Sequence, residues 1–219
     1  MLPPRRQLAE KIVILDFDGV LADTLDDILH FGELVCSRLG YPRKLTPDDL
    51  NALDRMEFAE IGRQIGLPEE KIDQFVQGNF ELFNQRQRPP RLFNGMDEVV
   101  RRASANCKIG VVTGNAASVV WRFLETYDLT KYVDVVLGAE FAGSRVDKIR
   151  QAINSIDRKA GSRIFVVGDS VSDIRAAQAV PATSIAVGWG HQRPEKLALT
   201  QPDFFAATPQ DLLAILAKN

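Results

Sequence analysis

Short apolar segments recur along the chain, one near its start and four from residue 109 onwards. Each is rich in β-branched residues, is apolar at nearly every position and is bounded by polar residues. Apolarity without alternation predicts strands that are covered on both faces, as in a parallel sheet. The expected strands are residues 12–15, 109–112, 133–137, 164–167 and 184–187.

Helical patterns alternate with these strands. The alternation predicts an α/β fold, with a doubly wound and mostly parallel sheet. A ligand of such a sheet binds beyond the carboxyl ends of the strands, so polar residues that follow a strand are candidates for a site. The helices expected in this part of the chain are residues 115–127, 148–156 and 174–179.

The segment after the first strand breaks this alternation, because it has helical patterns and no strand-like run. Thr46 and Pro47 are typical of a helix start, as N-cap and first helical residue. The prolines of residues 88–90 indicate a stiff linker that returns to the sheet. The expected helices of this segment are residues 25–39, 46–53, 57–65 and 68–83.

Two parts of the chain are therefore expected. Residues 1–22 and 89–219 would form an α/β core, and residues 23–88 an all-helical cap inserted after the first strand. We expect the cap to swing about its two linkers and to close over a small substrate, which would exclude water from the site.

Composition adds little to this picture but excludes some partners. The chain has 219 residues, of which 45% are hydrophobic and 26% charged, as in an ordinary globular protein. The formal net charge of −2 gives no bulk attraction to nucleic acid or to an anionic membrane. We expect neither as a partner, and a monomer or a homodimer as the oligomeric state. A bound anion must then be held by a few local groups.

The cysteines and histidines indicate neither a disulfide framework nor a histidine-based site. Cys36 and Cys107 lie far apart, without metal-ligand spacing or a disulfide framework, so we expect a cytoplasmic location. The first residues lack the pattern of a signal peptide, since the apolar run at 12–15 is too short, and no stretch has the length of a membrane span. His30 and His191 are the only histidines and leave little room for a histidine-based site.

The first chemical motif directly follows the first strand. Asp16 and Asp18 are two residues apart at the end of a buried strand, so their negative charges are crowded. Such crowding is costly unless a cation or a shared proton relieves it. Gly19 would let the backbone turn sharply and approach a ligand. The alternative is an ordinary loop in which aspartate favours the turn.

A second motif lies at the end of the strand at 109–112. Thr113, Gly114 and Asn115 lead into a helix, and a hydroxyl, free amides and a helix N-terminus together can hold an anion. Threonine and asparagine are also favoured simply as helix caps, so this signal is weak by itself.

A third motif follows the strand at 164–167. Asp169 ends that strand, and Asp173 lies four residues further on, at the beginning of a helix. Carboxylates are preferred ligands of Mg²⁺, which needs few protein groups. Asp173 has an alternative role as a favourable charge in a first helical turn. Lys148, between the second and third motifs, is an ordinary surface charge unless the other motifs give it a role.

Together, the ordered motifs resemble the haloacid dehalogenase superfamily. The resemblance rests on Asp16-x-Asp18-Gly, Thr113, Lys148 and Gly168-Asp169-x-x-x-Asp173, in that order, and the helical insertion is similar to the cap of that family. The segment DFDGVLADT, at residues 16–24, looks similar to the branch of phosphoglycolate-phosphatase-like enzymes. An acid at Asp18 points to phosphate esters, because dehalogenase members lack it.

The resemblance implies a role for each motif residue. Asp16 would be the nucleophile and become an aspartyl-phosphate, and Asp18 would be the general acid and base. Lys148 would offset the shared negative charge. The phosphoryl oxygens would be held by Thr113, Gly114 and Asn115, and Mg²⁺ by Asp16, Asp18, Asp169 and Asp173.

Three functions follow, in decreasing order of support. The first is a Mg²⁺-dependent phosphatase of a small phosphorylated metabolite. The second is a phosphomutase with the same nucleophile, because Val20 stands where many phosphatases of the family have threonine and some phosphomutases have valine. The third is a binding protein on the same scaffold, which the intact motifs argue against. The substrate stays open among phosphoglycolate, phosphosugars, pyrophosphate and nucleotides.

Four further residues are weaker candidates for a role in the site. Arg55 and Arg63 in the cap could meet a substrate carboxylate or a second phosphate, although cap arginines are more often solvated. His191 follows Gly188-Trp189-Gly190, and we expect it to be a solvated loop residue. For Cys107, before the strand at 109–112, we expect a buried, inert thiol.

Overall fold

A computed structural model describes residues 10–86 and 88–218. The expectation of no signal peptide concerns mostly residues 1–9, which lie outside the described residues, as do small parts of the predicted core and cap. No helix among the described residues is long and apolar enough to cross a membrane.

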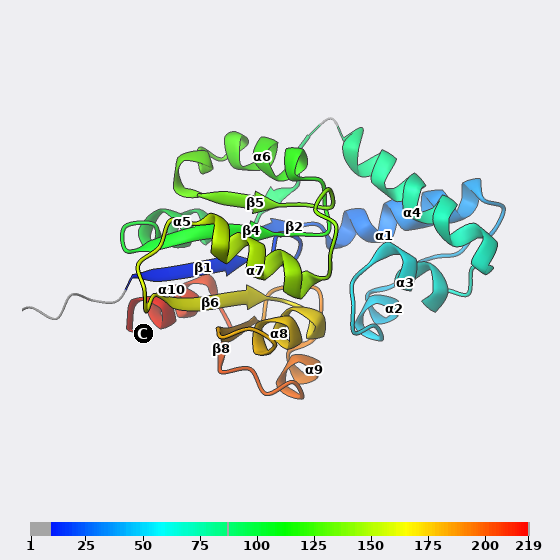
Figure 1. Ribbon diagram of the computed structural model, residues 1–219. Coiled ribbons are helices and arrows are strands. Elements are labelled where there is room, and N and C mark those ends of the chain that lie inside the picture. The colour runs from blue at the N-terminus through cyan, green and yellow to red at the C-terminus, as the bar shows by residue number, and fades with distance from the viewer. Residues whose placement is uncertain (1–9, 87, 219) are drawn as a thin grey trace, which may run out of the picture.

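Six parallel strands form the central sheet, in the order β5-β4-β1-β6-β7-β8. This confirms the doubly wound α/β class. All strands run the same way, so their carboxyl ends share one edge of the sheet (Figure 1). The strands are β1 (Lys11–Leu15), β4 (Cys107–Val112), β5 (Val135–Leu137), β6 (Arg163–Gly168), β7 (Thr183–Val187) and β8 (Phe204–Ala206).

Helices cover both faces of the sheet, which explains why the strands are apolar throughout. Val13 and Leu15 of β1 pack into one hydrophobic cluster, with α5 (Met96–Ala103), α6 (Ala117–Thr126) and α10 (Pro209–Lys218). Ile12 and Ile14, on the opposite face, pack into another with α7 (Arg145–Ser155) and α8 (Val171–Gln178). Alternate residues of one strand thus serve two cores. The remaining elements of this part are η1 (Thr130–Tyr132) and α9 (Pro194–Ala198).

The four helices between β1 and α5 among the described residues form the part that we call the cap. It has its own hydrophobic cluster, in which the fully buried Phe75 lies among residues from all four helices. The cap lies beyond the carboxyl ends of the strands (Figure 1). Its helices are α1 (Leu25–Arg38), α2 (Pro47–Asn51), α3 (Phe58–Gln64) and α4 (Glu69–Asn84).

Two short strands join the cap to the core. β2 (Ala22–Asp23) pairs in antiparallel fashion with β3 (Arg91–Leu92), so both connections to the cap run side by side. A second contact lies at the loop after α2. There the Lys196 ammonium donates to the carbonyl of Asn51 over 2.7 Å, and the Ser172 amide donates to the carbonyl of Asp54 over 3.0 Å. The cap therefore touches the core at two separated places.

Most predicted elements are present, with shifted ends. Thr46 caps α2 in a capping box with Asp49, and Pro47 is the first helical residue, as expected. The helix predicted at 148–156 begins three residues earlier, at Arg145, because Ser144 caps it. The sequence analysis missed β8 and the short pair β2–β3, since strands of two or three residues carry too little pattern to be seen.

Candidate active site

The loop after β1 brings two acids to the edge of the sheet that faces the cap. Asp16 follows the last residue of β1, and Asp18 lies in the turn beyond it. Gly19 has a φ of 78°, and a Cβ there would lie 1.9 Å from Oδ2 of Asp169. Only glycine permits this approach, so the predicted sharp turn is confirmed. This turn packs the loop of residues 16–18 against the end of β6.

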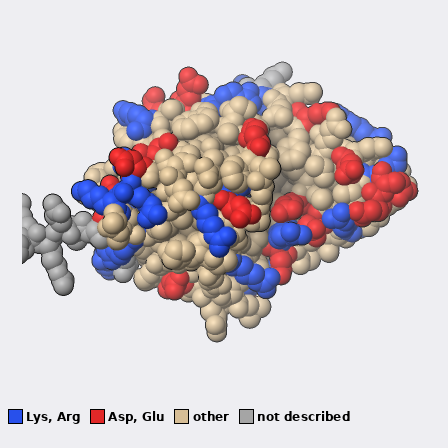
Figure 2. Space-filling view, viewed as in Figure 1, with Lys and Arg blue, Asp and Glu red and all other residues tan. Residues whose placement is uncertain are grey.

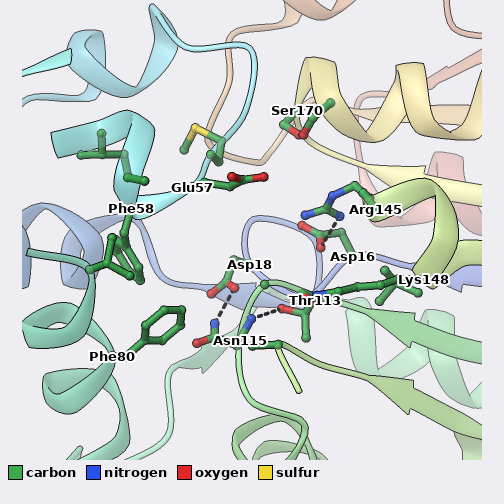
Figure 3. A pocket seen from close by; sticks show the side chains of 18 of the residues that line it. Asp16, Asp18, Glu57, Phe58, Phe80, Thr113, Asn115, Arg145, Lys148 and Ser170 are labelled. Atoms are coloured by element: carbon green, nitrogen blue, oxygen red, sulfur yellow. Dashed lines mark hydrogen bonds and ion pairs between the residues drawn. The ribbon is translucent and has the colours of Figure 1, made fainter. Parts of the chain in front are cut away.

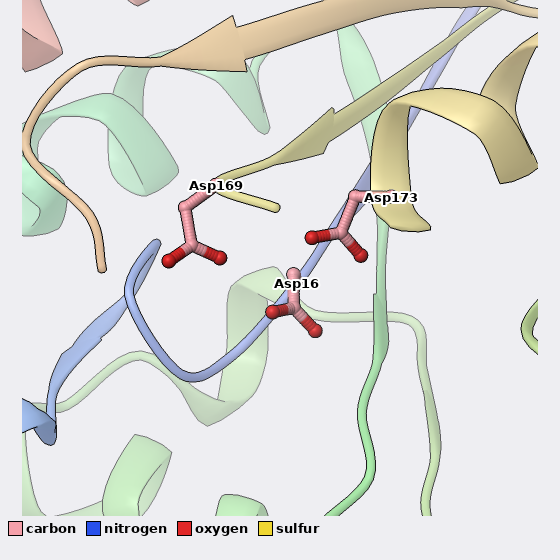
Figure 4. A group of neighbouring side chains, drawn as sticks. All are labelled: Asp16, Asp169 and Asp173. Atoms are coloured by element: carbon pink, nitrogen blue, oxygen red, sulfur yellow. The ribbon is translucent and has the colours of Figure 1, made fainter. Parts of the chain in front are cut away.

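Three of the predicted acids converge. Asp16 from β1, Asp169 from the end of β6 and Asp173 from the first turn of α8 each offer a carboxylate oxygen, and these oxygens lie within 4.8 Å of one another. Figure 4 shows the three carboxylates turned toward a common point. All three residues are buried. Asp173 also completes a capping box with Ser170, so its second oxygen stabilises the start of α8.

The charges of this cluster are not balanced by protein groups alone. Burial, together with the charge of Asp173, raises the pKa of Asp169 to about 8. Burial also raises the pKa of Asp16 well above its ordinary value, although Arg145 opposes the shift. A buried oxygen-donor cluster with excess negative charge is the environment that Mg²⁺ requires. The residues present therefore fit a magnesium ion.

Arg145 is the basic residue that touches this cluster. Its guanidinium donates to Oδ1 of Asp16 over 2.9 Å and forms an ion pair with Asp173. Burial alone would lower the pKa of Arg145, but the charges of Asp16 and Asp173 overcome it and raise the pKa. Arg145 was not among the residues predicted from the sequence. The signal was the capping box of Ser144 with Asp147, which starts α7 just before it.

Lys148 lies one turn further along α7. Its ammonium donates to the backbone carbonyl of Thr113 over 2.9 Å, and no contact joins it to Asp16 among the described residues. Burial and the neighbouring charge of Arg145 lower the pKa of Lys148. Among the described residues, Arg145 makes the direct ion pair with Asp16, while the charge of Asp16 opposes the lowering of the Lys148 pKa from further away. That Lys148 offsets the shared negative charge stays a prediction.

The segment after β4 differs in part from the prediction. The Thr113 hydroxyl accepts from the Asn115 amide over 3.0 Å, so it already shapes the turn. One amide at the N-terminus of α6 is engaged, because Ala117 donates to the carboxylate of Glu140. Binding of the phosphoryl oxygens by Thr113, Gly114 and Asn115 stays a prediction. The exposed Gly114 lies between these two turns and lines the site.

Asp18 is held at both carboxylate oxygens. The Thr24 hydroxyl donates to one over 2.9 Å, and the side-chain amide of Asn115 donates to the other over 2.6 Å. Burial raises the pKa of Asp18, while His191 and the two hydrogen bonds oppose the rise. A carboxyl group with a raised pKa suits proton transfer near neutral pH.

His191 is buried, with 7% of its surface exposed, so the expectation of a solvated loop residue is wrong. Its backbone amide donates to Oδ2 of Asp169 over 2.7 Å, and its ring nitrogen Nε2 lies 3.4 Å from the Thr24 hydroxyl. Gly190 makes this possible, because a Cβ there would lie 2.2 Å from Cβ of Asp169. The Gly188-Trp189-Gly190 sequence was the available signal.

A cavity of about 500 Å³ lies between the core and the cap. Figure 3 shows Asp16, Asp18 and Arg145 on one side of it, with Phe58 and Phe80 on the other. Arg55 and Arg63 are not among its lining residues, since their guanidinium groups pair with Glu60 and, for Arg63, also with Glu69. The core residues that line it include Thr113, Gly114, Asn115, Lys148, Asp169 and His191.

The remaining chemical residues are inert or outside the site. Cys36 and Cys107 are both buried and form no disulfide. Burial raises the pKa of the Cys107 thiol, which agrees with the expected inert role. Figure 2 shows basic and acidic side chains interspersed on the visible face, rather than one broad basic surface.

Comparison with known proteins identifies the family of this chain. The family model described as haloacid dehalogenase-like hydrolase matches residues 13–187. A protein of Synechococcus elongatus named phosphoglycolate phosphatase is 26% identical over 92% of this chain and 94% of its own length. A protein of Listeria monocytogenes named pyrophosphatase PpaX is 24% identical over 93% and 95% of the two lengths.

Solved structures share the fold. The crystal structure of a predicted phosphatase from Clostridium acetobutylicum superposes with a TM-score of 0.83 at 18% identity, over 96% of this chain and 100% of the other. The protein tyrosine kinase A of Mycobacterium tuberculosis gives a TM-score of 0.79 at 24% identity, over 95% and 99%. At such identity, the likeness shows the architecture alone.

Proposed function

Since this chain belongs to the haloacid dehalogenase-like hydrolases, we propose that it is a Mg²⁺-dependent phosphatase of small phosphate monoesters, which acts through an aspartyl-phosphate. One observation carries the proposal. Asp16, Asp169 and Asp173 converge within 4.8 Å, beside Arg145 and at the floor of a cavity that Asp18 also lines. The names of the relatives, phosphoglycolate phosphatase and pyrophosphatase, support phosphate release as the reaction.

The reaction would take place in two displacements. A carboxylate oxygen of Asp16 attacks phosphorus, the bond from phosphorus to the leaving oxygen breaks, and Asp18 gives its proton to that oxygen. A water molecule then attacks the aspartyl-phosphate, Asp18 takes the proton from the water, and free phosphate leaves Asp16. The raised pKa of Asp18 supports its proton-donor role, and its hydrogen bonds to Thr24 and Asn115 fix its direction.

The magnesium ion would be held by Asp16, Asp169 and Asp173, with the backbone carbonyl of Asp18 as a further ligand. When bound, it would neutralise phosphoryl charge and keep the buried carboxylates ionised. Arg145 would hold Asp16 in place and offset its charge, and Lys148 would hold the Thr113 segment against the phosphoryl oxygens.

A substitution at the nucleophile tests the mechanism. Asp16→Asn keeps the shape of the side chain but removes its nucleophilic charge, so phosphate release from p-nitrophenyl phosphate with Mg²⁺ should fall at least about 10⁴-fold. Asp157→Asn, at an exposed aspartate outside the site, is the control and should keep full activity. Turnover that survives in Asp16→Asn, or after removal of all divalent metal, would exclude the mechanism.

The alternative of a phosphomutase gains no support. It rested on Val20, which is 0% exposed, packs in the core cluster and is not among the residues that line the cavity. Product analysis separates the two functions, since a phosphomutase returns an isomerised phosphosugar and a phosphatase returns free phosphate.

Cap movement, location and assembly stay predictions. We propose that the cap opens about β2 and β3, because these two short strands carry both connections to the core. Unchanged backbone dihedral angles in the two strands, with and without a bound phosphate analogue, would contradict this. A cytoplasmic location and a monomer or homodimer remain our expectation.

A further inference from the structure

The cap and the core contribute different chemistry to the cavity. Glu57 is the only charged residue that the cap contributes among the described lining residues. The other cap residues that line the cavity are apolar, and several of their side chains are partly exposed. Phe58 and Phe80 meet edge to face, with centroids 5.4 Å apart. The apolar cap residues include Met56, Phe58, Ile61, Val76, Phe80 and Phe83.

The cavity has room for more than a phosphate group. Its volume of about 500 Å³ is in the range of pockets that take a drug-sized ligand. A phosphoryl group at Asp16 would fill only the core end. The leaving group would then extend toward Phe58 and Phe80, where an apolar body would remove partly exposed aromatic surface from water (Figure 3).

The basic residues are placed for the phosphoryl group and not for a second anion. Arg145 and Lys148, the two basic residues that line the described cavity, both come from α7 on the core side. In the cap, Arg86 pairs with Asp27 and stacks on Phe83, and it does not line the cavity. Arg86 lowers the pKa of Asp18 from a distance, but no cation of the cap lines the described cavity, so a carboxylate or second phosphate on the leaving group would have no cap cation to pair with there.

Glu57 makes this side unfavourable to anions. It is the N-cap residue of α3, yet its side chain makes no capping hydrogen bond, and no ion pair engages its carboxylate among the described residues. Figure 3 shows the carboxylate directed into the space before Arg145 and Asp16. Its charge also acts on Lys148 across the cavity. A negative leaving group would be repelled there, and an ammonium group would be attracted.

We propose that the substrate of this site is a phosphate monoester with an apolar, preferably aromatic, leaving group that carries an ammonium group and no second anion. The proposal rests on the proposed phosphatase function and deepens it. It separates this chain from the activities in the names of its relatives, because phosphoglycolate and pyrophosphate both have anionic leaving groups.

Matched substrates test the proposal. 3-(Aminomethyl)phenyl phosphate and 3-carboxyphenyl phosphate share a body and differ in a charge on the side of the ring, nearer the ester end that Glu57 faces, and phenyl phosphate is the neutral reference. An exposed ion pair changes affinity by about 1.5-fold to fivefold, and the exchange of attraction for repulsion between the two substrates squares this factor, to about twofold to thirtyfold. We therefore expect kcat/KM, measured as phosphate release with Mg²⁺, to be about twofold to thirtyfold higher for the amine than for the carboxylate.

Glu57→Gln locates the origin of that preference. The amine-to-carboxylate ratio of kcat/KM should fall toward one in Glu57→Gln and should invert in Glu57→Lys. Glu60→Gln is the control, because Glu60 pairs with Arg55 and Arg63 and does not line the cavity, so its ratio should equal that of the wild type. A ratio within each variant is independent of any general loss of activity.

Three outcomes would overturn the proposal. The first is a wild-type preference for 3-carboxyphenyl phosphate or for phosphoglycolate over the amine. The second is an unchanged ratio in Glu57→Gln with both rates lowered, which would make Glu57 a contact that holds the cap. The third is the absence of phosphate release from every substrate, which would remove the phosphatase function itself and is distinguishable from the other two.

Discussion

The residues of the core that line the cavity (the core wall) and the residues of the cap that line it (the cap wall) differ in their chemistry. On the core wall, charged groups hold one another: Arg145 pairs with Asp16 and Asp173, and Asp18 accepts from Thr24 and Asn115. The cap wall is apolar, and its one charged residue, Glu57, makes no ion pair among the described residues. Our proposal therefore assigns the reaction to a network of paired polar groups, and the choice of substrate to surfaces that still lack a partner.

This difference follows from where each wall comes from in the chain. The core wall gathers the residues that follow parallel strands, and the sheet itself brings them together. The cap wall comes from separate helices, which pack against one another around Phe75. A change in the cap can therefore alter specificity while the strand ends keep their geometry. Our predictions test this division, from the largest expected effect to the smallest.

The core wall should depend much more on Arg145 than on Lys148. Arg145→Met would leave two buried carboxylates without their basic partner, whereas Lys148→Met removes one hydrogen bond to a backbone carbonyl. We expect kcat with p-nitrophenyl phosphate to fall about 10³-fold for Arg145→Met and about tenfold for Lys148→Met.

Arg145→Lys is the control for that comparison. It keeps the positive charge but not the fork that reaches two carboxylates, so its activity should lie between the wild type and Arg145→Met. Thermal unfolding of each variant separates loss of folding from loss of turnover. A larger effect at Lys148 than at Arg145 would mean that Lys148 is the main group that offsets the charge shared by phosphate and nucleophile, as the resemblance to the family implied.

Some residues of the core wall could be predicted from the sequence and others could not. Asp16 and Asp169 were identified because an apolar run followed by aspartate is a local pattern, and Asp173 because it lies four residues after Asp169 at a helix start. Arg145 was missed because the expected helix began at Lys148, one turn too late, although Ser144 and Asp147 carry the capping pattern. His191 was misjudged because its burial depends on Gly190 packing against Asp169, a contact between distant residues.

The residues of the cap wall could not be predicted from the sequence, because they too depend on contacts between distant residues. Its helices were predicted with ends within about two residues, but periodicity does not say which side of a helix faces the core domain and which faces its own cluster. Phe58, Phe75 and Phe80 look alike in sequence. Only the packing of the cap separates the buried Phe75 from the two phenylalanines that line the cavity.

The second prediction concerns pH and the metal-free core wall. Asp169 has its pKa raised from 3.8 to about 8, so the folded state binds a proton that the unfolded state has lost between these values. The free energy of unfolding should therefore fall as pH rises through this window. The lowered pKa of buried His191 acts in the opposite sense, but only below its ordinary value of 6.5.

Between pH 6.5 and pH 8, the raised pKa of Asp169 therefore acts without the opposing effect of His191. There we expect the metal-free protein to lose on the order of 1–2 kcal/mol of stability. Mg²⁺ should cancel most of this loss, since it binds the ionised carboxylates. Denaturant unfolding with chelator and with Mg²⁺ at several pH values measures both effects, and Asp169→Asn should remove the fall. Metal-free stability that is constant or rises across this window would contradict the shared charge of the cluster.

The smallest effect should come from the cap wall, and it should change binding rather than chemistry. Phe80 is partly exposed and lines the cavity, on the side opposite Asp16. Phe80→Ala removes apolar surface that an aromatic leaving group would cover, which corresponds to about a fivefold to tenfold rise in KM for phenyl phosphate. The kcat value should change by less than about twofold, because the Asp16 network does not contact Phe80 and its interactions are the same in substrate and transition state.

Tyr41→Ala is the matched control for this variant. Tyr41 is an exposed aromatic residue between α1 and α2 that does not line the cavity, so its removal should leave KM unchanged. An acyclic phosphate ester that is too short to reach the aromatic residues gives a second control, since its KM should be equal in Phe80→Ala and wild type. If kcat fell in Phe80→Ala for both substrates, the cap wall would contribute to catalysis through closure of the site, and the separation of chemistry from substrate choice would fail. If KM rose only for the aromatic ester, that separation would hold at the level of a single side chain.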